Sequence, residues 1–218
     1  MSSTTYLFSK ESKDSKLRVP FTFSTYSNVE EFLNETSFFN KFKSILSDPK
    51  NSELNSLSDL DAFIYMNTEY LNTTDENGQT PLIWSVINVG SCPIIPLLNC
   101  KANPNIQDNS GKTALMYAVQ SKHHWVDSTE LLCDYKPEYF NRETMEREPV
   151  NMKTDVNIQD NLGNTALIYA SMWCRPKCAE VLLKCGALVD LQNNEGKRVM
   201  NYVNELQTRV QQAIKNSS

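Results

Sequence analysis

Three stretches of the chain share one pattern: Asp75–Val86 is DENGQTPLIWSV, Asp108–Val119 is DNSGKTALMYAV, and Asp160–Ser171 is DNLGNTALIYAS. In each stretch Asp is followed by Gly after three residues, Thr after five and Leu after seven. The first and second copies start 33 positions apart, and the second and third start 52 apart, which is 19 more. A weaker copy, NNEGKRVMNYV, begins at Asn193, again 33 positions after the third. A period of this length is typical of arrays in which each unit packs only on its neighbours.

Each unit also has a second half that predicts a second helix. In the third unit Thr165 precedes an apolar stretch, where its hydroxyl can cap the first helix. Pro176 stands at the start of the second helix, where its missing N–H costs nothing. Gly186 is placed to end that helix in a left-handed conformation. The second helices share a leucine pair: Leu97/Leu98, Leu131/Leu132 and Leu182/Leu183.

These features resemble the ankyrin-repeat family, whose 33-residue unit opens its first helix with Thr-Pro-Leu-His-x-Ala. The resemblance covers about residues 75–204. It departs from the family pattern where Ile83, Met116 and Ile168 replace the helix-start His, and where Lys101 replaces a Gly. The segments NIQDNSGKTALMYA (Asn105–Ala118) and NIQDNLGNTALIYA (Asn157–Ala170) are similar to segments of ankyrin proteins encoded by large DNA viruses of amoebae. The resemblance implies an all-α ankyrin-repeat solenoid of helix-turn-helix units with short hairpin-like fingers.

The register divides the chain into six expected segments. They are a mobile N-terminal arm at 1–27, a helical cap or degenerate repeat at 28–74, an ankyrin repeat at 75–107, a second repeat at 108–159, a third at 160–192, and a degenerate C-terminal capping repeat at 193–218. Apolar spacing predicts cap helices at Asn28–Asn34, Ser37–Leu46 and Asp59–Met66, and a closing helix at Asn201–Asn216.

The second repeat carries an insertion of about 19 residues near 134–153. We expect one or two helical turns at Asn141–Glu148. The insertion could be a functional loop, because loops on rigid scaffolds often carry function. The alternative is a tolerated surface insertion, because long surface loops cost little entropy.

Composition argues against several classes of function. The 218 residues carry a net charge of −5 with no long basic run, so we expect no nucleic-acid partner. The chain lacks GxSxG, HExxH and P-loop motifs, which predicts that it is not an enzyme and needs no cofactor. Its two histidines, His123 and His124, are adjacent, and Cys174 and Cys178 flank a proline. The sequence therefore predicts no metal site.

The six cysteines and the N-terminus bear on location. No apolar stretch follows a basic start, so we expect no secretory signal and reduced thiols. The uncharged stretch Asn77–Cys100 contains Pro93 and Pro96, which disfavour a membrane span. We expect an intracellular, cytoplasmic protein, in the host cell if it is viral.

The resemblance implies that a protein partner binds at the finger tips and on the concave face of the first helices. The alternative is that the tips are simply good turn residues. The candidate binding residues are Glu76, Asn77, Gln79, Asn88, Asn109, Ser110, Lys112, Gln120, Asn161, Leu162, Asn164, Met172 and Trp173.

Aromatic residues occupy two of the register positions. We expect Trp173 at an exposed site, where it could be an interface hot spot; packing against the loop between the helices is the alternative. Trp84, Tyr117 and Tyr169 share another position, which we expect to be interior.

The sequence thus predicts a monomeric, non-catalytic protein-protein interaction module or adaptor. If the protein is viral, we expect it to be a factor that engages host proteins. The alternative is a structural or assembly component that packs against itself or a larger particle. Because one fold serves many pathways, the sequence does not identify the partner.

Overall fold

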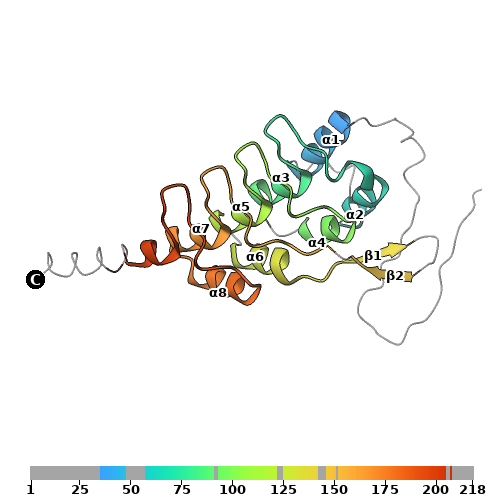
Figure 1. The fold of residues 1–218 in the computed structure, drawn as a ribbon. Coiled ribbons are helices and arrows are strands. Elements are labelled where there is room, and N and C mark those ends of the chain that lie inside the picture. The colour runs from blue at the N-terminus through green and yellow to red at the C-terminus, as the bar shows by residue number, and fades with distance from the viewer. Residues whose placement is uncertain are drawn as a thin grey trace, which may run out of the picture. The chain divides into compact units, whose positions relative to one another are not determined.

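The computed structural model describes residues 35–47, 57–90, 93–121, 125–141, 146–150, 152–204 and 207, all within one compact unit, Leu33–Ser218. Figure 1 shows the order of the elements. The helices are α1 (Glu35–Ser47), α2 (Leu57–Met66), the short 3-10 helix η1 (Thr68–Tyr70), α3 (Pro81–Asn88), α4 (Ile94–Asn99), α5 (Ala114–Gln120), α6 (Trp125–Asp134), α7 (Ala166–Met172) and α8 (Pro176–Lys184). The strands are β1 (Glu138–Asn141) and β2 (Glu146–Pro149), and residues 199–204 are again helical.

The helices form two stacked rows. The first row contains α3, α5 and α7, and the second contains α2, α4, α6 and α8, with each helix packed on the next of its row. The pairs α3–α4, α5–α6 and α7–α8 join the rows, and hairpin-like fingers project along one edge (Figure 1). The predicted ankyrin-repeat solenoid is therefore confirmed.

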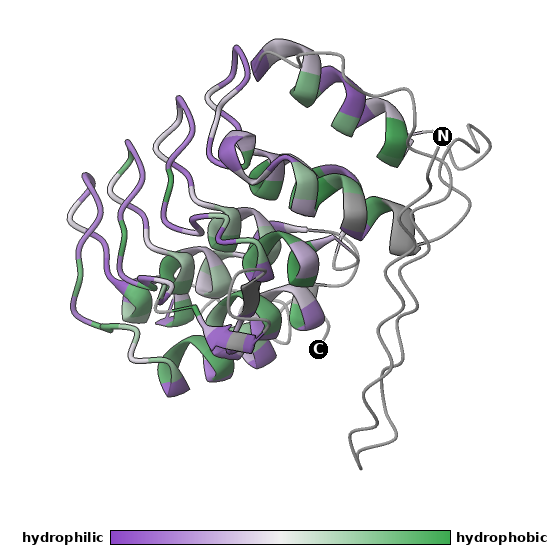
Figure 2. Cartoon of the chain, turned by 90° about the vertical axis from the view of Figure 1, so that its right-hand side faces the viewer, coloured by the Kyte–Doolittle hydropathy of each residue, from purple (hydrophilic) through white to green (hydrophobic). Residues whose placement is uncertain are grey.

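Local sequence explains where the helices begin. The Thr165 hydroxyl accepts a hydrogen bond from Ile168 N at 3.2 Å, and Thr80 caps α3 through Ile83 N at 3.3 Å. Pro176 stands in the first turn of α8, as predicted. Apolar side chains of both rows point inward, so the helices in Figure 2 are hydrophobic where they face one another, whereas the fingers are mostly hydrophilic.

An aromatic cluster joins α1 and α2 to the first repeat. The Phe38 ring stacks on Phe63 and Tyr70 at centroid distances of 5.4 and 5.6 Å, and Phe42 meets Trp84 edge-on at 6.2 Å. The predicted helices at Ser37–Leu46 and Asp59–Met66 are confirmed as parts of α1 and α2. The arm at 1–27 and the predicted helix at Asn28–Asn34 lie outside the described residues.

An asparagine side chain of one unit accepts a hydrogen bond from the backbone of the corresponding turn in the next unit. This bond recurs through the stack and also joins the N-terminal cap to the first repeat. Asn105 Oδ1 accepts from Asp155 N and Asn157 Oδ1 accepts from Leu188 N, both at 2.8 Å. Asn72 Oδ1 accepts in the same way, from the backbone N–H of the first repeat's corresponding turn, at 2.7 Å. The residues before Asp75 thus follow the register of the repeats, in support of a degenerate repeat there.

The insertion corrects one prediction. Strands β1 and β2 pair antiparallel, with Tyr139 opposite Glu148, so helical turns at Asn141–Glu148 are wrong. Tyr139 and Phe140 favour strands, and Glu148 precedes Pro149, which disfavours helical backbone at that residue. The hairpin is anchored on α4, because Asn99 Oδ1 accepts from Glu138 N at 3.1 Å.

The closing helix is described only in part. Residues 199–204 are helical, in agreement with its predicted start, and most of 205–218 lies outside the described residues. Within the described ranges, no helix has the length and apolar character that crossing a membrane requires.

Candidate protein-binding surface

The repeated aspartates build the fingers. Asp108 Oδ1 accepts from the N–H groups of Ser110 and Lys112, at 2.8 and 2.9 Å. Asp160 Oδ1 holds the third finger in the same way, and Asp75 the first. Each carboxylate thus shapes a turn.

The second carboxylate oxygen binds a tyrosine from the following helix. Tyr117 Oη donates to Asp108 Oδ2 at 2.6 Å, and Tyr169 Oη donates to Asp160 Oδ2. Burial raises the pKa of both phenols, and the bonded carboxylates raise it further. The interior placement predicted for Tyr169 is confirmed, whereas Tyr117 and Trp84 are half-buried against the core.

The first repeat has Trp84 where the others have tyrosine, so Asp75 needs another donor. Lys43 of α1 supplies it, with Nζ 2.8 Å from Asp75 Oδ2. Burial alone would raise the pKa of Asp75, but hydrogen bonds from Lys43, Gln79 N and Asn77 N outweigh it and hold that pKa below its usual value. Nothing in the repeat pattern pointed to Lys43, which lies outside the recognisable units.

Asparagine amides tie neighbouring fingers together. Asn109 Nδ2 donates to Glu76 O at 2.9 Å, Asn161 Nδ2 to Asn109 O at 3.0 Å, and Asn194 Nδ2 to Asn161 O at 2.9 Å. We call these three bonds the finger ladder. Asn109 and Asn161 were predicted as binding residues, and the structure shows that their amides also hold the fingers in fixed register.

Another predicted residue lies inside the protein. Asn164 is buried, and its Oδ1 accepts from Asn193 Nδ2 at 2.9 Å. It cannot touch a partner at the surface, so its prediction as a binding residue is wrong. The side chain instead joins two fingers beneath their tips.

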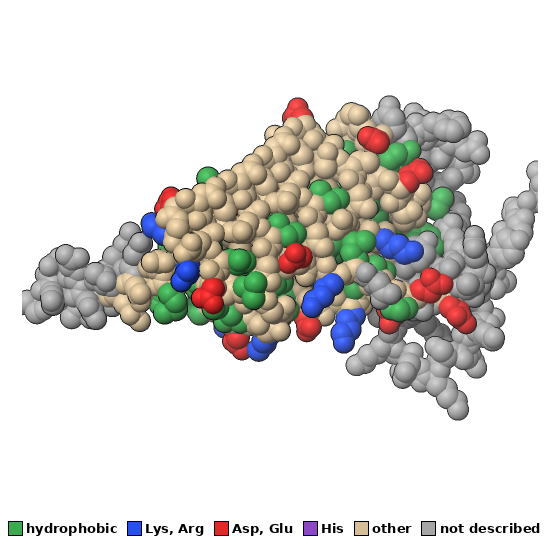
Figure 3. Space-filling view, viewed as in Figure 1, with side chains coloured by type: hydrophobic (Ala, Val, Ile, Leu, Met, Phe, Trp, Pro, Cys, Tyr) green, Lys and Arg blue, Asp and Glu red, His purple; other side chains and the backbone are tan. Residues whose placement is uncertain are grey.

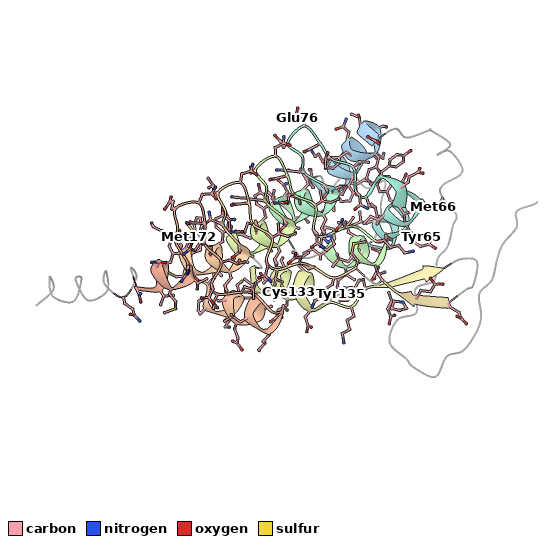
Figure 4. All side chains as sticks on the ribbon, in the orientation of Figure 1. Tyr65, Met66, Glu76, Cys133, Tyr135 and Met172 are labelled. Atoms are coloured by element: carbon pink, nitrogen blue, oxygen red, sulfur yellow. The ribbon has the colours of Figure 1, made fainter. Side chains whose placement is uncertain are left out.

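The remaining predicted tip residues are accessible. Glu76, Asn77, Ser110 and Leu162 are exposed, and Gln79 is half-buried. Figure 4 shows Glu76 at the tip of the first finger. These side chains leave a polar edge with one large apolar group, Leu162.

Four of the predicted residues lie at the ends of α3, α5 and α7, together with Ile87, which was not predicted as a binding residue. Ile87, Gln120 and Met172 occupy one register position, with Asn88 and Trp173 at the next; we call these five residues the inner row. All are exposed except Gln120, which is half-buried. The predicted exposure of Trp173 is confirmed, and its role in binding stays a prediction. Figure 4 shows Met172 at the end of α7.

Lys112 places a positive charge beside the inner row. Its Nζ lies 5.4 Å from the ring centre of Tyr117 and 4.9 Å from that of Tyr169, and donates to Gln120 Oε1 at 3.3 Å. Among the described residues, no carboxylate forms an ion pair with it. This ammonium is therefore free to meet an acidic group on another molecule.

Thiol chemistry has little support in the described part of the chain. Burial raises the pKa of Cys100 to about 12, and burial likewise raises that of Cys178. Such thiols are poor nucleophiles at neutral pH. No three His, Cys, Asp or Glu side chains converge as a metal site requires in these residues, whereas His123, His124 and Cys92 lie outside them.

Sequence reasoning missed a groove between α6 and α8. Its volume is about 650 Å³, and Leu131, Tyr135, Val181 and Cys185 contribute to its wall. Figure 4 labels Tyr135, which follows α6 in the chain. The groove lies along the second row of helices, away from the predicted binding residues.

Known proteins are similar to this chain in sequence. A family profile described as "Ankyrin repeats (3 copies)" matches residues 52–144 and 82–195. Neurogenic locus notch homolog protein 1 of Mus musculus is 34% identical over 151 residues, which cover 61% of this chain and 6% of that protein. The human homologue is 33% identical over 150 residues, with the same coverage.

A viral relative is also found. A putative ankyrin repeat protein of Acanthamoeba polyphaga mimivirus is 44% identical over 75 residues, which cover 33% of this chain and 18% of that protein. This match confirms the predicted similarity to ankyrin proteins of amoebal viruses. The chain spans a small part of the length of each of these relatives.

Proposed function

Because the chain belongs to the ankyrin-repeat family, we propose that it is a non-catalytic adaptor that binds another protein through its inner row and finger tips. Ankyrin repeats generally mediate protein-protein interaction. The observation that carries the proposal is the inner row itself, where Ile87, Met172 and Trp173 are exposed and Gln120 accepts a hydrogen bond from the Lys112 ammonium. Tryptophan is enriched in interface hot spots, which makes Trp173 the strongest candidate of the row.

The scaffold supports this proposal through its rigidity. The finger ladder fixes each tip against the next one, and the buried Asp160–Tyr169 bond fixes a finger on its helix. A surface ordered before binding loses less conformational entropy when a partner docks. Binding would thus leave the backbone of the fingers largely unchanged.

Affinity capture with mass spectrometry tests the proposal. The wild type is compared with a double variant, Trp173→Ala with Lys112→Glu, which removes the largest exposed group and reverses the charge. The matched control is Ile95→Ala with Lys184→Glu, which makes the same kinds of change at exposed residues of α4 and α8. Circular dichroism verifies that all three proteins are folded.

The adaptor proposal predicts partners that the wild type and the control retain and the inner-row variant loses. Partners lost equally from both variants would place binding elsewhere on the protein. If the wild type retains no specific partner, the adaptor function itself is wrong.

The mimivirus relative supports a narrower proposal, a viral factor that engages host proteins in the cytoplasm. None of the described cysteines forms a disulfide, as is expected of thiols in a reducing compartment. Capture from uninfected amoeba lysate tests the narrower proposal, because a host partner must be present without virus. Recovery of viral proteins only, from infected lysate, would contradict it.

A further inference from the structure

The C-terminal end of the repeat stack exposes apolar positions that are buried in the preceding repeats. Met200 is 58% exposed, whereas Leu82, Leu115 and Leu167 at the same register position are at most 1% exposed. The chemistry is similar in all four copies, since each residue is large and apolar. The difference comes from the neighbouring unit, which covers the three leucines.

Two further positions behave in the same way. Val189 is 44% exposed, whereas its equivalent Val156 is 5% exposed. Leu183 is 48% exposed, against 6% for Leu98 of the first repeat. We call Leu183, Val189 and Met200 the C-terminal end face. Figure 3 shows hydrophobic side chains at the surface over α8, the helix that contributes Leu183.

The polar layer at this end is satisfied. With its amide oriented to accept, Gln192 binds Arg198 Nε and Nη2 at 3.1 and 2.9 Å. Asn193 Nδ2 donates to Asn164 Oδ1 at 2.9 Å and contacts Tyr202 Oη at 3.0 Å. The finger layer therefore ends in hydrogen bonds, whereas the apolar side chains of the end face lie on α8, in the turn that follows it and in the helical residues 199–204.

Residues 205–218 lack the sequence pattern that forms the second helix of the preceding repeats. Lys215 and Asn216 stand one period after the pair Leu182/Leu183, where a second helix would bury leucines. No Gly or Pro follows Gly196, although the first and third repeats turn between their helices at Gly90 and Cys174, with positive φ. Apolar residues instead continue at alternating spacings of four and three, which is the pattern of a helix-pairing seam: Val199, Val203, Leu206, Val210 and Ala213.

The other end of the stack is closed. Phe38, Phe42 and Ile64 of α1 and α2 are fully buried against the first repeat. A second chain cannot place its C-terminal end face on that end without displacing these helices. Head-to-tail association is therefore disfavoured, and only a two-fold arrangement brings two end faces together.

We propose that the C-terminal end face is a self-association surface, on which a second copy of this chain packs tail-to-tail about a two-fold axis. The contact continues the apolar packing that joins one repeat to the next. Asp190 directly follows Val189, and Arg198 stands two residues before Met200. Both are exposed and carry opposite charges, so a two-fold rotation can bring each beside the other of the second copy. The proposal replaces the monomer expected from the sequence.

Sedimentation velocity of the full chain over a range of concentrations tests the proposal. We expect a species of twice the 24.9 kDa chain mass that dissociates on dilution. Met200→Lys should weaken the dimer at least about tenfold, because it places a charge in the apolar contact. Met66→Lys is the matched control, with the same substitution at a methionine that is 60% exposed at the closed end, and it should leave the dimer unchanged.

Four outcomes would overturn the proposal. A single species of the chain mass at every concentration would exclude self-association, and open-ended polymers would exclude the two-fold arrangement. A full chain that is monomeric while a chain ending at Asn204 dimerises would show that residues 205–218 cover the face themselves. Equal weakening by Met66→Lys would place the contact elsewhere. None of these results depends on whether the inner row binds a partner.

Discussion

The two ends of the repeat stack differ in how they meet solvent. At the N-terminal end α1 and α2 supply aromatic rings that bury the first repeat, and Lys43 of α1 completes its finger. At the C-terminal end, Leu183, Val189 and Met200 have no such cover among the described residues. Burial of a repeat position is therefore set by the adjoining unit, because identical register positions range from buried to exposed.

The largest loss of stability is expected from a substitution in the aromatic cluster at the closed N-terminal end. Phe42→Ala removes a fully buried ring from the contact with Trp84 and should lower the free energy of unfolding by about 3–5 kcal/mol. Met200→Ala removes a side chain of the open end and should change it by less than about 0.5 kcal/mol. Urea denaturation at concentrations where the chain is monomeric measures both. Similar losses for the two variants would mean that the C-terminal end is also covered.

A smaller loss of stability is expected when the glycine of a finger is substituted, and it should be larger in an interior finger than in the last one. Gly111 and Gly196 have nearly equal φ angles, 76° and 72°, but a Cβ on Gly111 would lie 2.5 Å from Asn161 Oδ1, whereas none of the described atoms lies within 4 Å of a Cβ on Gly196. Gly196→Ala should cost about 1–2 kcal/mol for its left-handed backbone. Gly111→Ala should cost about 1–3 kcal/mol more, because the neighbouring finger must move.

Thermal denaturation of the two glycine variants measures that difference. Equal losses would show that the fingers do not press on one another and that the finger ladder is looser than the structure indicates.

The smallest effect concerns pH at the closed end. Lys43→Met removes the partner of Asp75 and should cost about 1 kcal/mol at pH 7. The pKa of Asp75 is held below its unfolded value, so its contribution is present above about pH 4 and is lost as the pH falls through the folded pKa. The difference between wild type and variant should therefore shrink at pH 3.

Urea denaturation at the two pH values checks this, with Lys184→Met as control. Lys184 pairs with Glu180 on the exposed surface of α8, and its loss should have no measurable effect at either pH. A Lys43→Met deficit that is the same at pH 3 and pH 7 would show that the Asp75 ion pair does not stabilise the fold.

The sequence predicted features that depend on local pattern. The spacing of Asp, Gly and Thr identified the fingers and helix starts, and Thr165 caps α7 as expected. The same reasoning failed at Asn141–Glu148, where strands form because the hairpin can attach to Asn99 of α4, a contact that short-range patterns do not show. Asn164 was misplaced for a similar reason, since a finger residue is buried only when the next finger supplies Asn193.

By itself, therefore, the sequence determined the repeat, its register, the helices and the fingers, because a 33-residue period and capping residues act within one unit. Only the tertiary structure decided which register positions face a neighbour and which amides join fingers. It also decided that Lys43 forms an ion pair with Asp75. These properties arise between units, where solvent exposure depends on what packs alongside. The repeat register predicted most of the inner row, whereas the C-terminal end face could be defined only once those neighbours were in place.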